Sequence, residues 1–578
     1  MSNPTIHFTL SFVEPQAHYV EVEMSLQGFD QDFIDLKMPV WTPGSYLVRE
    51  YARHVERVSA YADEEHIPCT KVAKDTWRIQ HQGKPVKVKY SVYGFEVSVR
   101  TNFIDGDHAF ISPAGTFLYP DNYLHLPSTI AVLLPASWSK ISTGLPTVEN
   151  QAHTFYAADF DILFDAPLEI GNQDVWHFEA AGIPHEFAMV GTANYSQERL
   201  SKDITKIVEV ETEIWGENPN KNYVFITHNY QSGFGGLEHL NSTVLAASRN
   251  SYAHPSAYKN FLSLVAHEYF HLWNVKRLRP TALGPFDYSA ENYTTGLWIM
   301  EGFTAYYDNL IVRRCGFFSE EEYLNQLAID FNTVYNRQGY KIQSAALASF
   351  DTWIKQYRPD ENSVNTSISY YNKGAMLAAA IDLKIISETK GAKRLDAVLK
   401  AAYQHFYVDK NRGFEEDEFQ ELAEQVSGVN LGEIFYAAHH DLELDYNDYF
   451  GRVGYQLIDQ NAQHHELSFG IKTSTNDGRL LIKQIERNSA AWDAGLSVDD
   501  EIIALNGIRV DAAGKELEYI HETSQENDII DLLIARDGLL KTIPTPLRRS
   551  SKKIFVIKEN PAASAAEREL GKLWLATQ

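Results

Sequence analysis

Hydrophobic and polar positions divide the chain into three stretches with different periods. Over residues 20–26, Val, Val, Met and Leu alternate with Glu, Glu and Ser, and residues 86–92 alternate in the same way. A period of two is typical of strands that bury one face. Turn clusters such as residues 41–45 separate these strands. The pattern predicts an antiparallel β domain over residues 1–170.

A helical period replaces the alternation from about residue 196. Two helices are expected around residues 261–271 and 296–308, which carry the candidate chemistry. Further helices are expected at residues 374–389, 395–408, 415–427 and 431–442. These segments predict a mainly helical domain over residues 171–445, so the whole chain belongs to the multidomain α+β class.

Short strands return near residue 446. The strand at 480–485 precedes a segment that ends in Ala-Gly-Leu at 494–496 and a strand that ends in Asn-Gly at 506–507. This order resembles a bacterial PDZ domain, and an Asp-Gly hairpin signal suits its last strands. The resemblance implies a PDZ domain over residues 446–557, followed by a helical tail over 558–578. It also implies a groove for a peptide C-terminus, bordered by Ser468, Phe469, Gly470 and Ile471. A domain that only packs against the catalytic domain is the alternative.

Composition narrows the class of partner. The chain has 578 residues, too many for one hydrophobic core, and a formal net charge of -26. That charge argues against nucleic acid and anionic membranes as partners. The two cysteines lie far apart, so no disulfide framework is expected. The N-terminus lacks the pattern of a signal peptide, and no apolar stretch is long enough to span a bilayer, which predicts a cytoplasmic protein.

The segment His267-Glu268-Tyr269-Phe270-His271 contains the most specific chemical pattern. On a helix, His267 and His271 lie one turn apart on one face and can bind one metal ion. Glu268 is then placed to accept a proton from a water that the metal activates. The alternative is a helix whose histidines are hydrogen-bonded in a core.

The helix expected at residues 296–308 favours the metal interpretation. It is apolar around Glu301, and a lone carboxylate in such a run is costly to bury unless it is paired or binds metal. As a third ligand, Glu301 completes a His2Glu site for one Zn²⁺ per chain, with a fourth position open to water. Asp308 lies two helical turns further along and is predicted to orient a zinc-bound histidine. An exposed polar role for Asp308 is the alternative.

The chain as a whole resembles the glycyl aminopeptidase family of zinc metallopeptidases. The resemblance rests on Trp-Thr-Pro-Gly-Ser-Tyr at residues 41–46, on residues 267–277, and on Glu-Gly-Phe-Thr at 301–304. It implies a β domain, a thermolysin-like catalytic domain with a glutamate third ligand, and a C-terminal PDZ domain.

The resemblance also implies the substrate contacts. Residues 235–239 are similar to a Gly-x-Met-Glu-Asn motif, with Leu in place of Met and His in place of Asn. Glu238, with Gly235 and Gly236 before it, is thereby predicted to bind the free amine of the substrate. Tyr371, in a Tyr-x-Lys-Gly segment, is predicted to stabilise the tetrahedral intermediate. A loop carboxylate and one more structural tyrosine are the respective alternatives.

These residues predict a zinc-dependent aminopeptidase that removes N-terminal residues from peptides with a free N-terminus. A preference for Gly or Ala follows from the resemblance alone. The alternatives are a zinc endopeptidase, which has no use for Glu238, and a PDZ peptide-binding scaffold with a vestigial zinc site. For Lys276, Arg277 and Arg279, binding of a peptide carboxylate and a solvated or salt-bridged face both stay open.

Overall fold

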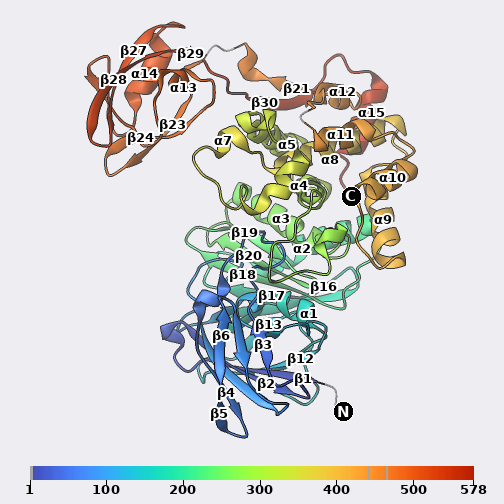
Figure 1. Cartoon of the computed structure of the whole chain (residues 1–578). Coiled ribbons are helices and arrows are strands. Elements are labelled where there is room, and N and C mark those ends of the chain that lie inside the picture. Colours follow the sequence, from blue (N-terminus) through green and yellow to red (C-terminus); the bar gives the residue numbers. More distant parts are fainter. Residues whose placement is uncertain (1–3, 441, 464–465) are drawn as a thin grey trace.

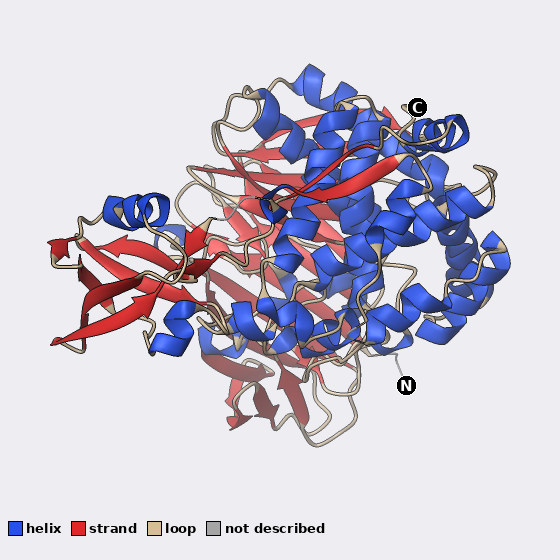
Figure 2. Ribbon diagram, turned by 90° about the horizontal axis from the view of Figure 1, so that it is seen from above, coloured by secondary structure: helices blue, strands red, loops and turns tan. Residues whose placement is uncertain are grey.

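Three regions follow one another along the chain in this computed structural model, which describes residues 4–440, 442–463 and 466–578. Figure 1 shows β strands at the N-terminal end, a helical centre, and a second β region formed by the C-terminal part. Figure 2 shows the helices gathered on one side of the central strands. The predicted multidomain α+β class is confirmed. Within the described part of the chain, no helix combines the length and apolar content needed to cross a membrane.

The N-terminal region is built from three sheets around one apolar core. A seven-stranded sheet has the order β14-β12-β1-β2-β8-β4-β5, and two four-stranded sheets have the orders β13-β15-β10-β9 and β11-β3-β7-β6. The strands are β1 (Thr5–Ser11), β2 (Tyr19–Gln27), β3 (Ile34–Lys37), β4 (Val55–Ala62), β5 (Glu65–Ile67), β6 (Cys69–Ala73), β7 (Thr76–Ile79), β8 (Val86–Tyr93), β9 (Phe103–Ile104), β10 (Ala109–Ile111), β11 (Tyr119–Pro120), β12 (Ser128–Leu133), β13 (Lys140–Thr143), β14 (Thr154–Ala157) and β15 (Leu168–Gly171).

The two alternating segments found in the sequence are neighbours in the seven-stranded sheet. β2 and β8 pair antiparallel, with Val20 opposite Val92 and Met24 opposite Val88, and these side chains are buried. Cross-strand apolar pairs of this kind stabilise a half-buried sheet. β1 runs parallel to β12, so the sheet departs in one place from the antiparallel pattern that was expected.

A five-stranded sheet joins the N-terminal region to the helices and was not foreseen. Its order is β16-β17-β18-β20-β19, with β16 (Asp174–Ala180), β17 (Ile183–Val190), β18 (Tyr223–Tyr230), β19 (Phe234–Glu238) and β20 (Ser242–Ser248). β18 is buried on both faces because Val224 and Ile226 pack toward Val99 and Phe110 of the N-terminal region. A strand buried on both faces lacks alternation, which is why its pattern is ambiguous in the sequence.

The helices pack on the other face of this sheet and share its core. They are α2 (Gln197–Trp215), α3 (Pro255–Phe270), α4 (Leu297–Arg314), α5 (Glu320–Tyr335), α6 (Ala345–Phe350), α7 (Ser363–Thr366), α8 (Tyr370–Glu388), α9 (Leu395–Ala402), α10 (Glu416–Ser427), α11 (Gly432–His439) and α12 (Tyr446–Gly451), while α1 (Phe160–Phe164) belongs to the N-terminal region. The helix expected at 395–408 is α9 followed by a π-helical turn, Tyr403–Asp409. The helix expected at 431–442 is α11, and residue 441 lies outside the described residues.

Helices α4 and α8 cross in close contact. A Cβ added at Gly302 on α4 would lie 2.4 Å from the Cα of Gly374 on α8. Only hydrogen side chains at both positions allow this approach. The crossing brings Glu301, which precedes Gly302 on α4, close to the first turn of α8.

The C-terminal β region has a core of its own. Its main sheet contains β23 (Ile471–Asn476), β24 (Arg479–Ile485), β25 (Glu501–Leu505), β26 (Ile508–Arg509), β27 (Ile529–Arg536) and β28 (Leu539–Pro546), with α13 (Ala490–Ala494), α14 (Lys515–Thr523), and the short pair β22 (Leu467–Ser468) and β29 (Arg548–Arg549). Its buried apolar residues run from Leu467 to Leu547.

The segments on either side of that core pack with the helices instead. β21 (Tyr455–Asp459) pairs with β30 (Phe555–Glu559), and their buried residues Leu457 and Ile557 belong to the large helical core. α15 (Ala565–Trp574) docks there as well, with buried Trp574 donating from its indole to the hydroxyl of Tyr306 at 2.9 Å. The C-terminal β region is therefore an insertion between two strands that complete the helical domain.

Candidate active site

Helices α3 and α4 bring the three predicted metal ligands together. α3 begins at Pro255, which suits the first helical position because it has no N–H to leave unpaired, and its last residue is Phe270. His267 lies in its last turn and His271 directly follows it. The Nε2 atoms of His267 and His271 lie 3.6 Å and 3.2 Å from the same oxygen, Oε2 of Glu301. One carboxylate oxygen and two imidazole nitrogens thus face one point.

The outer ring nitrogens determine what those three atoms can hold. Nδ1 of His271 donates to the carbonyl oxygen of Asn274 at 2.8 Å, and Nδ1 of His267 lies 3.0 Å from Oδ2 of Asp308. With both Nδ1 atoms donating, each Nε2 presents a lone pair. Two lone pairs and a carboxylate oxygen repel one another unless a proton or a metal ion lies among them. The donor set therefore fits a divalent ion, and His2Glu with one further position is the arrangement of catalytic zinc.

Burial and charge give the two glutamates of the site different proton affinities. Burial alone raises the pKa of Glu301, but His271 and His267 lower it to about 2, so this carboxylate is charged at neutral pH. Burial raises the pKa of Glu268 to about 7, although the two histidines oppose the change. Glu268 is thereby suited both to accept and to release a proton near neutral pH. Its Oε2 is buried and has no partner among the described residues.

Two glycines let the backbone approach the carboxylates of Glu268 and Glu238. A Cβ on Gly236 would lie 2.3 Å from Oε1 of Glu268, and a Cβ on Gly44 would lie 2.5 Å from Oε1 of Glu238. Gly44 has φ +81°, a conformation that also favours glycine. Gly44 belongs to the turn at residues 41–46, so the N-terminal region forms one wall of the site. Glu238 is buried at the end of β19, the edge strand of the five-stranded sheet.

All the predicted catalytic and substrate-binding residues line one cavity of about 420 Å³. Its wall consists of Gly44, Arg100, Phe234, Gly235, Gly236, Glu238, Asn260, Ser263, Leu264, His267, Glu268, His271, Glu301, Asp308, Asn309, Gln326 and Tyr371. Tyr371 lies in the first turn of α8, with its ring centre 6.4 Å from that of His267. The α4–α8 crossing places it beside Glu301.

Two further residues at the site were not found in the sequence. Arg100, from a loop of the N-terminal region, donates from Nη2 to the carbonyl of Gly236 at 3.1 Å. It is the only Lys or Arg that the described part of the chain contributes to the cavity wall. Tyr357 donates from its hydroxyl to the carbonyl of Gly44 at 3.3 Å. Neither belongs to a recognisable motif, because contacts between distant segments leave no periodic signal.

Comparison with known proteins gives three family-model matches. They are the peptidase M61 N-terminal domain at residues 7–172, the M61 glycyl aminopeptidase at 260–377, and the PDZ domain at 456–535. The resemblance predicted from the sequence is thereby confirmed. The chain carries an M61 peptidase domain and is a metallo-aminopeptidase.

One solved structure is similar over nearly the whole chain, and a second matches part of it. An aminopeptidase N family protein from Idiomarina loihiensis is 28% identical with a TM-score of 0.92, over 99% of this chain and 100% of its own. An M1 zinc metallopeptidase from Deinococcus radiodurans is 13% identical with a TM-score of 0.49, over 76% of this chain and 94% of its own. No curated protein sequence matches the chain at a significant level.

The basic cluster after the second histidine has structural partners. Nζ of Lys276 lies 2.6 Å from Oδ1 of Asp165 in the N-terminal region. Arg277 is buried and donates to backbone carbonyls and to Oδ1 of Asn220, at 2.6 Å. Arg279 stacks over the ring of Phe286. The structure thus favours the salt-bridged interpretation for Lys276 and a buried structural role for Arg277.

Figure 1 shows β23 and β24, which follow the loop predicted to border the PDZ groove, apart from α3 and α4. Phe469 is fully buried in the PDZ core, and Ile471 begins β23. Ser468 and Gly470 line a hollow of about 200 Å³ that also includes Lys341 of the helical domain. A groove bordered by all four residues stays a prediction.

Proposed function

We propose that this metallo-aminopeptidase uses one zinc ion, held by His267, His271 and Glu301, to remove small N-terminal residues from peptides. The observation that carries the proposal is the single cavity that joins these ligands to a buried carboxylate, Glu238. A buried carboxylate beside a metal group suits an ammonium ion, the one group that every unblocked peptide presents at its first residue.

Each side chain has a distinct part in the reaction. When bound, zinc lowers the pKa of water and polarises the scissile carbonyl. Glu268 accepts the proton of the attacking water and delivers it to the leaving amine, which its pKa of about 7 permits. Tyr371 donates a hydrogen bond from its hydroxyl to the carbonyl oxygen as negative charge develops there. Asp308 keeps His267 in the tautomer that presents Nε2.

The preference for glycine or alanine rests on the family resemblance. The family model over residues 260–377 is that of a glycyl aminopeptidase. Glu238 ends the strand that carries Gly236, and its carboxylate lies against Gly44, where an added Cβ would lie 2.5 Å from Oε1. This close packing fixes the carboxylate that binds the ammonium group. The preference among substrates then depends on the first side chain and on the rest of the peptide.

A substrate panel tests the proposal. Glycyl, alanyl and leucyl chromogenic substrates are compared with acetylated peptides, with and without a chelator. We expect cleavage of free-amine substrates only, abolished by the chelator, with glycyl and alanyl faster than leucyl. Equal cleavage of acetylated peptides would establish the endopeptidase alternative. Leucyl substrates that exceed the other two would remove the size preference alone.

Substitution of Glu238 isolates the amine contact. A hydrogen bond to a charged group contributes about 1.5–3 kcal/mol, so Glu238→Ala should lower kcat/KM for free-amine substrates by about 10–150-fold. The matched control is Glu179→Ala, an exposed carboxylate on β16, which changes the net charge equally. If both variants behave alike, Glu238 does not bind the amine.

We further propose that the PDZ region binds a peptide C-terminus. Asp459 and Phe555 are opposite each other where β21 pairs with β30, so a short linker can replace residues 464–551 without opening the helical core. Cleavage of long peptides should fall relative to dipeptides in this variant. Equal rates for both lengths would exclude a role in substrate handling.

A further inference from the structure

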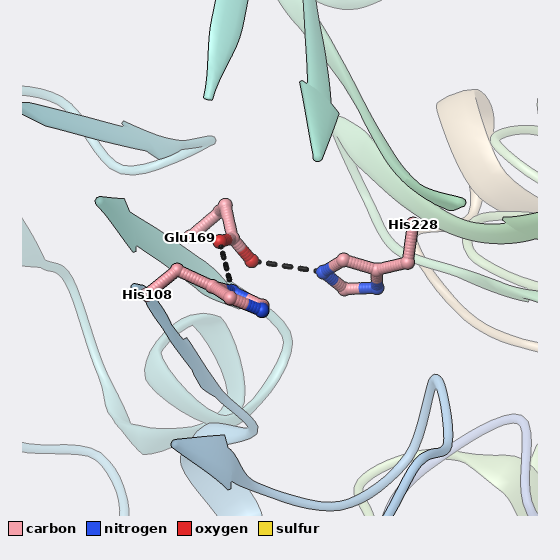
Figure 3. A group of neighbouring side chains, drawn as sticks. All are labelled: His108, Glu169 and His228. Atoms are coloured by element: carbon pink, nitrogen blue, oxygen red, sulfur yellow. Dashed lines mark hydrogen bonds and ion pairs between the residues drawn. The ribbon is translucent and has the colours of Figure 1, made fainter. Parts of the chain in front are cut away.

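A second group of metal-binding residue types lies outside the active site. Among the described residues, only two groups bring three His, Cys, Asp or Glu donor atoms within 4.8 Å of one another, and the second consists of His108, Glu169 and His228. His108 directly precedes β10, Glu169 lies on β15, and His228 lies on β18. Figure 3 shows the carboxylate between the two rings. Two members come from the N-terminal region and one from the five-stranded sheet.

Each carboxylate oxygen of Glu169 lies within hydrogen-bond distance of one imidazole nitrogen. Oε1 lies 2.7 Å from Nδ1 of His108, and Oε2 lies 2.8 Å from Nε2 of His228 (Figure 3). A carboxylate that turns both oxygens toward two nitrogens suits two-oxygen chelation of an ion placed among all four atoms. Two imidazoles and a carboxylate are ligands that Zn²⁺, Co²⁺ and Ni²⁺ accept and that Mg²⁺ and Ca²⁺ disfavour.

The charge of this group is not balanced by an Arg or a Lys. Glu169 is fully buried, and its ion-pair partners among the described residues are the two histidines. Burial alone raises the pKa of Glu169, but His108 and His228 lower it, so the carboxylate is charged. A carboxylate buried without an Arg or Lys partner is costly unless its charge is shared with a proton on an imidazole or with a metal ion. A divalent ion removes that cost.

The group also has an entry path. His108 and His228 line a cavity of about 760 Å³, whose wall includes Asp105, Asp107 and Asp174. Arg249 is the only Lys or Arg among the described residues of that wall. An acidic cavity raises the local concentration of cations. It also leaves room for water to complete the coordination of an ion.

We propose that His108, Glu169 and His228 bind a second divalent transition-metal ion, which joins the N-terminal region to the five-stranded sheet of the catalytic domain. This site shares no residue with the cavity that contains Glu268. Nδ1 of His228 is buried and has no partner among the described residues. Because partners of the outer nitrogen change metal affinity by about 10–100-fold, the second ion binds more weakly than the catalytic one.

Metal stoichiometry is the direct test. Full-length protein is dialysed to equilibrium against Zn²⁺, and bound zinc is measured by mass spectrometry. We expect two ions per chain for the wild type, in two affinity classes, and one for Glu169→Gln and for His108→Gln. His177→Asn is the matched control, because His177 pairs with Glu186 at 3.3 Å without a third donor, and it should keep both ions.

Thermal unfolding provides a second readout that does not depend on activity. Glu301→Ala removes a catalytic ligand, so added Zn²⁺ reaches only the second site. Zinc should raise the unfolding midpoint of this variant by several degrees and leave Glu301→Ala/His108→Gln unchanged, because an ion that binds only the folded state stabilises it. If Glu169→Gln does not fold, His108→Gln, at a partly exposed position, still carries the test.

Two outcomes overturn the proposal. One is a single zinc ion per chain in the wild type, unchanged by Glu169→Gln or His108→Gln. The other is a Glu301→Ala protein that neither binds zinc nor gains thermal stability from it. Either result makes the group a hydrogen-bonded His–Glu–His contact between two domains.

Discussion

The two His–Glu–His groups use the same residue types in opposite ways. In the active site, two histidines share one oxygen of Glu301, and their outer nitrogens are held by Asp308 and by a backbone carbonyl. In the second group, Glu169 gives one oxygen to each histidine, and the outer nitrogen of His228 has no partner among the described residues.

The difference lies in how each group is assembled. His267 lies in the last turn of α3, His271 directly follows that helix and Glu301 lies on α4, so two packed helices set the geometry of the catalytic group. The second group depends on the N-terminal region docking against β18. On the roles proposed above, the outer hydrogen bonds of the first group favour tight metal binding, whereas the second group suits an exchangeable ion.

The largest expected effect is a loss of kcat when a glutamate at the active site, but not one in the second group, is replaced by glutamine. Glu268→Gln should lower kcat by about 10²–10⁴-fold, because it removes the proton acceptor and donor, while the catalytic zinc stays bound. Glu169→Gln, the same substitution in the second group, should leave kcat within a small factor of wild type. Steady-state kinetics with zinc analysis of both proteins checks this. A zinc-loaded Glu268→Gln enzyme with near-normal turnover would falsify the assignment of the base.

The next largest effect on kcat is expected for Tyr371→Phe. Loss of one donor to a developing oxyanion lowers kcat by about 10²–10³-fold, and KM should change little because the contact forms mainly in the transition state. Tyr370→Phe is the matched control, since the Tyr370 hydroxyl accepts from Thr352 at 3.0 Å outside the cavity wall. A variant of Tyr371 altered only in KM contradicts the role.

Asp308→Asn tests the outer hydrogen bond itself. The amide is a poorer acceptor for Nδ1 of His267, so zinc affinity of the active site should fall by about 10–100-fold. The affinity of the second group should stay constant, which provides an internal control. Competition with a chromogenic chelator measures both. An unchanged first affinity means that the outer contact does not explain the difference between the groups.

The smallest effect concerns the helix crossing behind the active site. Gly302→Ala places a Cβ 2.4 Å from Gly374, and overpacking of this kind costs about 1–3 kcal/mol of unfolding free energy. For Gly432→Ala at the start of α11, the nearest atom to the added Cβ is Oδ1 of Asn430 at 3.6 Å. This substitution should leave the unfolding free energy unchanged or raise it. Urea unfolding of both variants, followed by circular dichroism, measures the difference. Equal stability would show that α4 and α8 can separate without cost.

Local spacing made much of this protein predictable. The alternation at residues 20–26 and 86–92 became paired strands, because period-two burial needs no knowledge of distant segments. His267, His271 and Glu268 were recognisable because a helix fixes their relation within one turn. The C-terminal strand and turn order, with its PDZ resemblance, was likewise a property of contiguous sequence.

Only the tertiary structure decided the contacts that join separate elements. Arg100 and Gly44 reach the cavity from the N-terminal region, and β18 is buried on both faces because that region covers it. His108, Glu169 and His228 lie far apart in sequence and meet where two domains dock. Such contacts carry no period and no fixed spacing, since they depend on how whole sheets and helices pack.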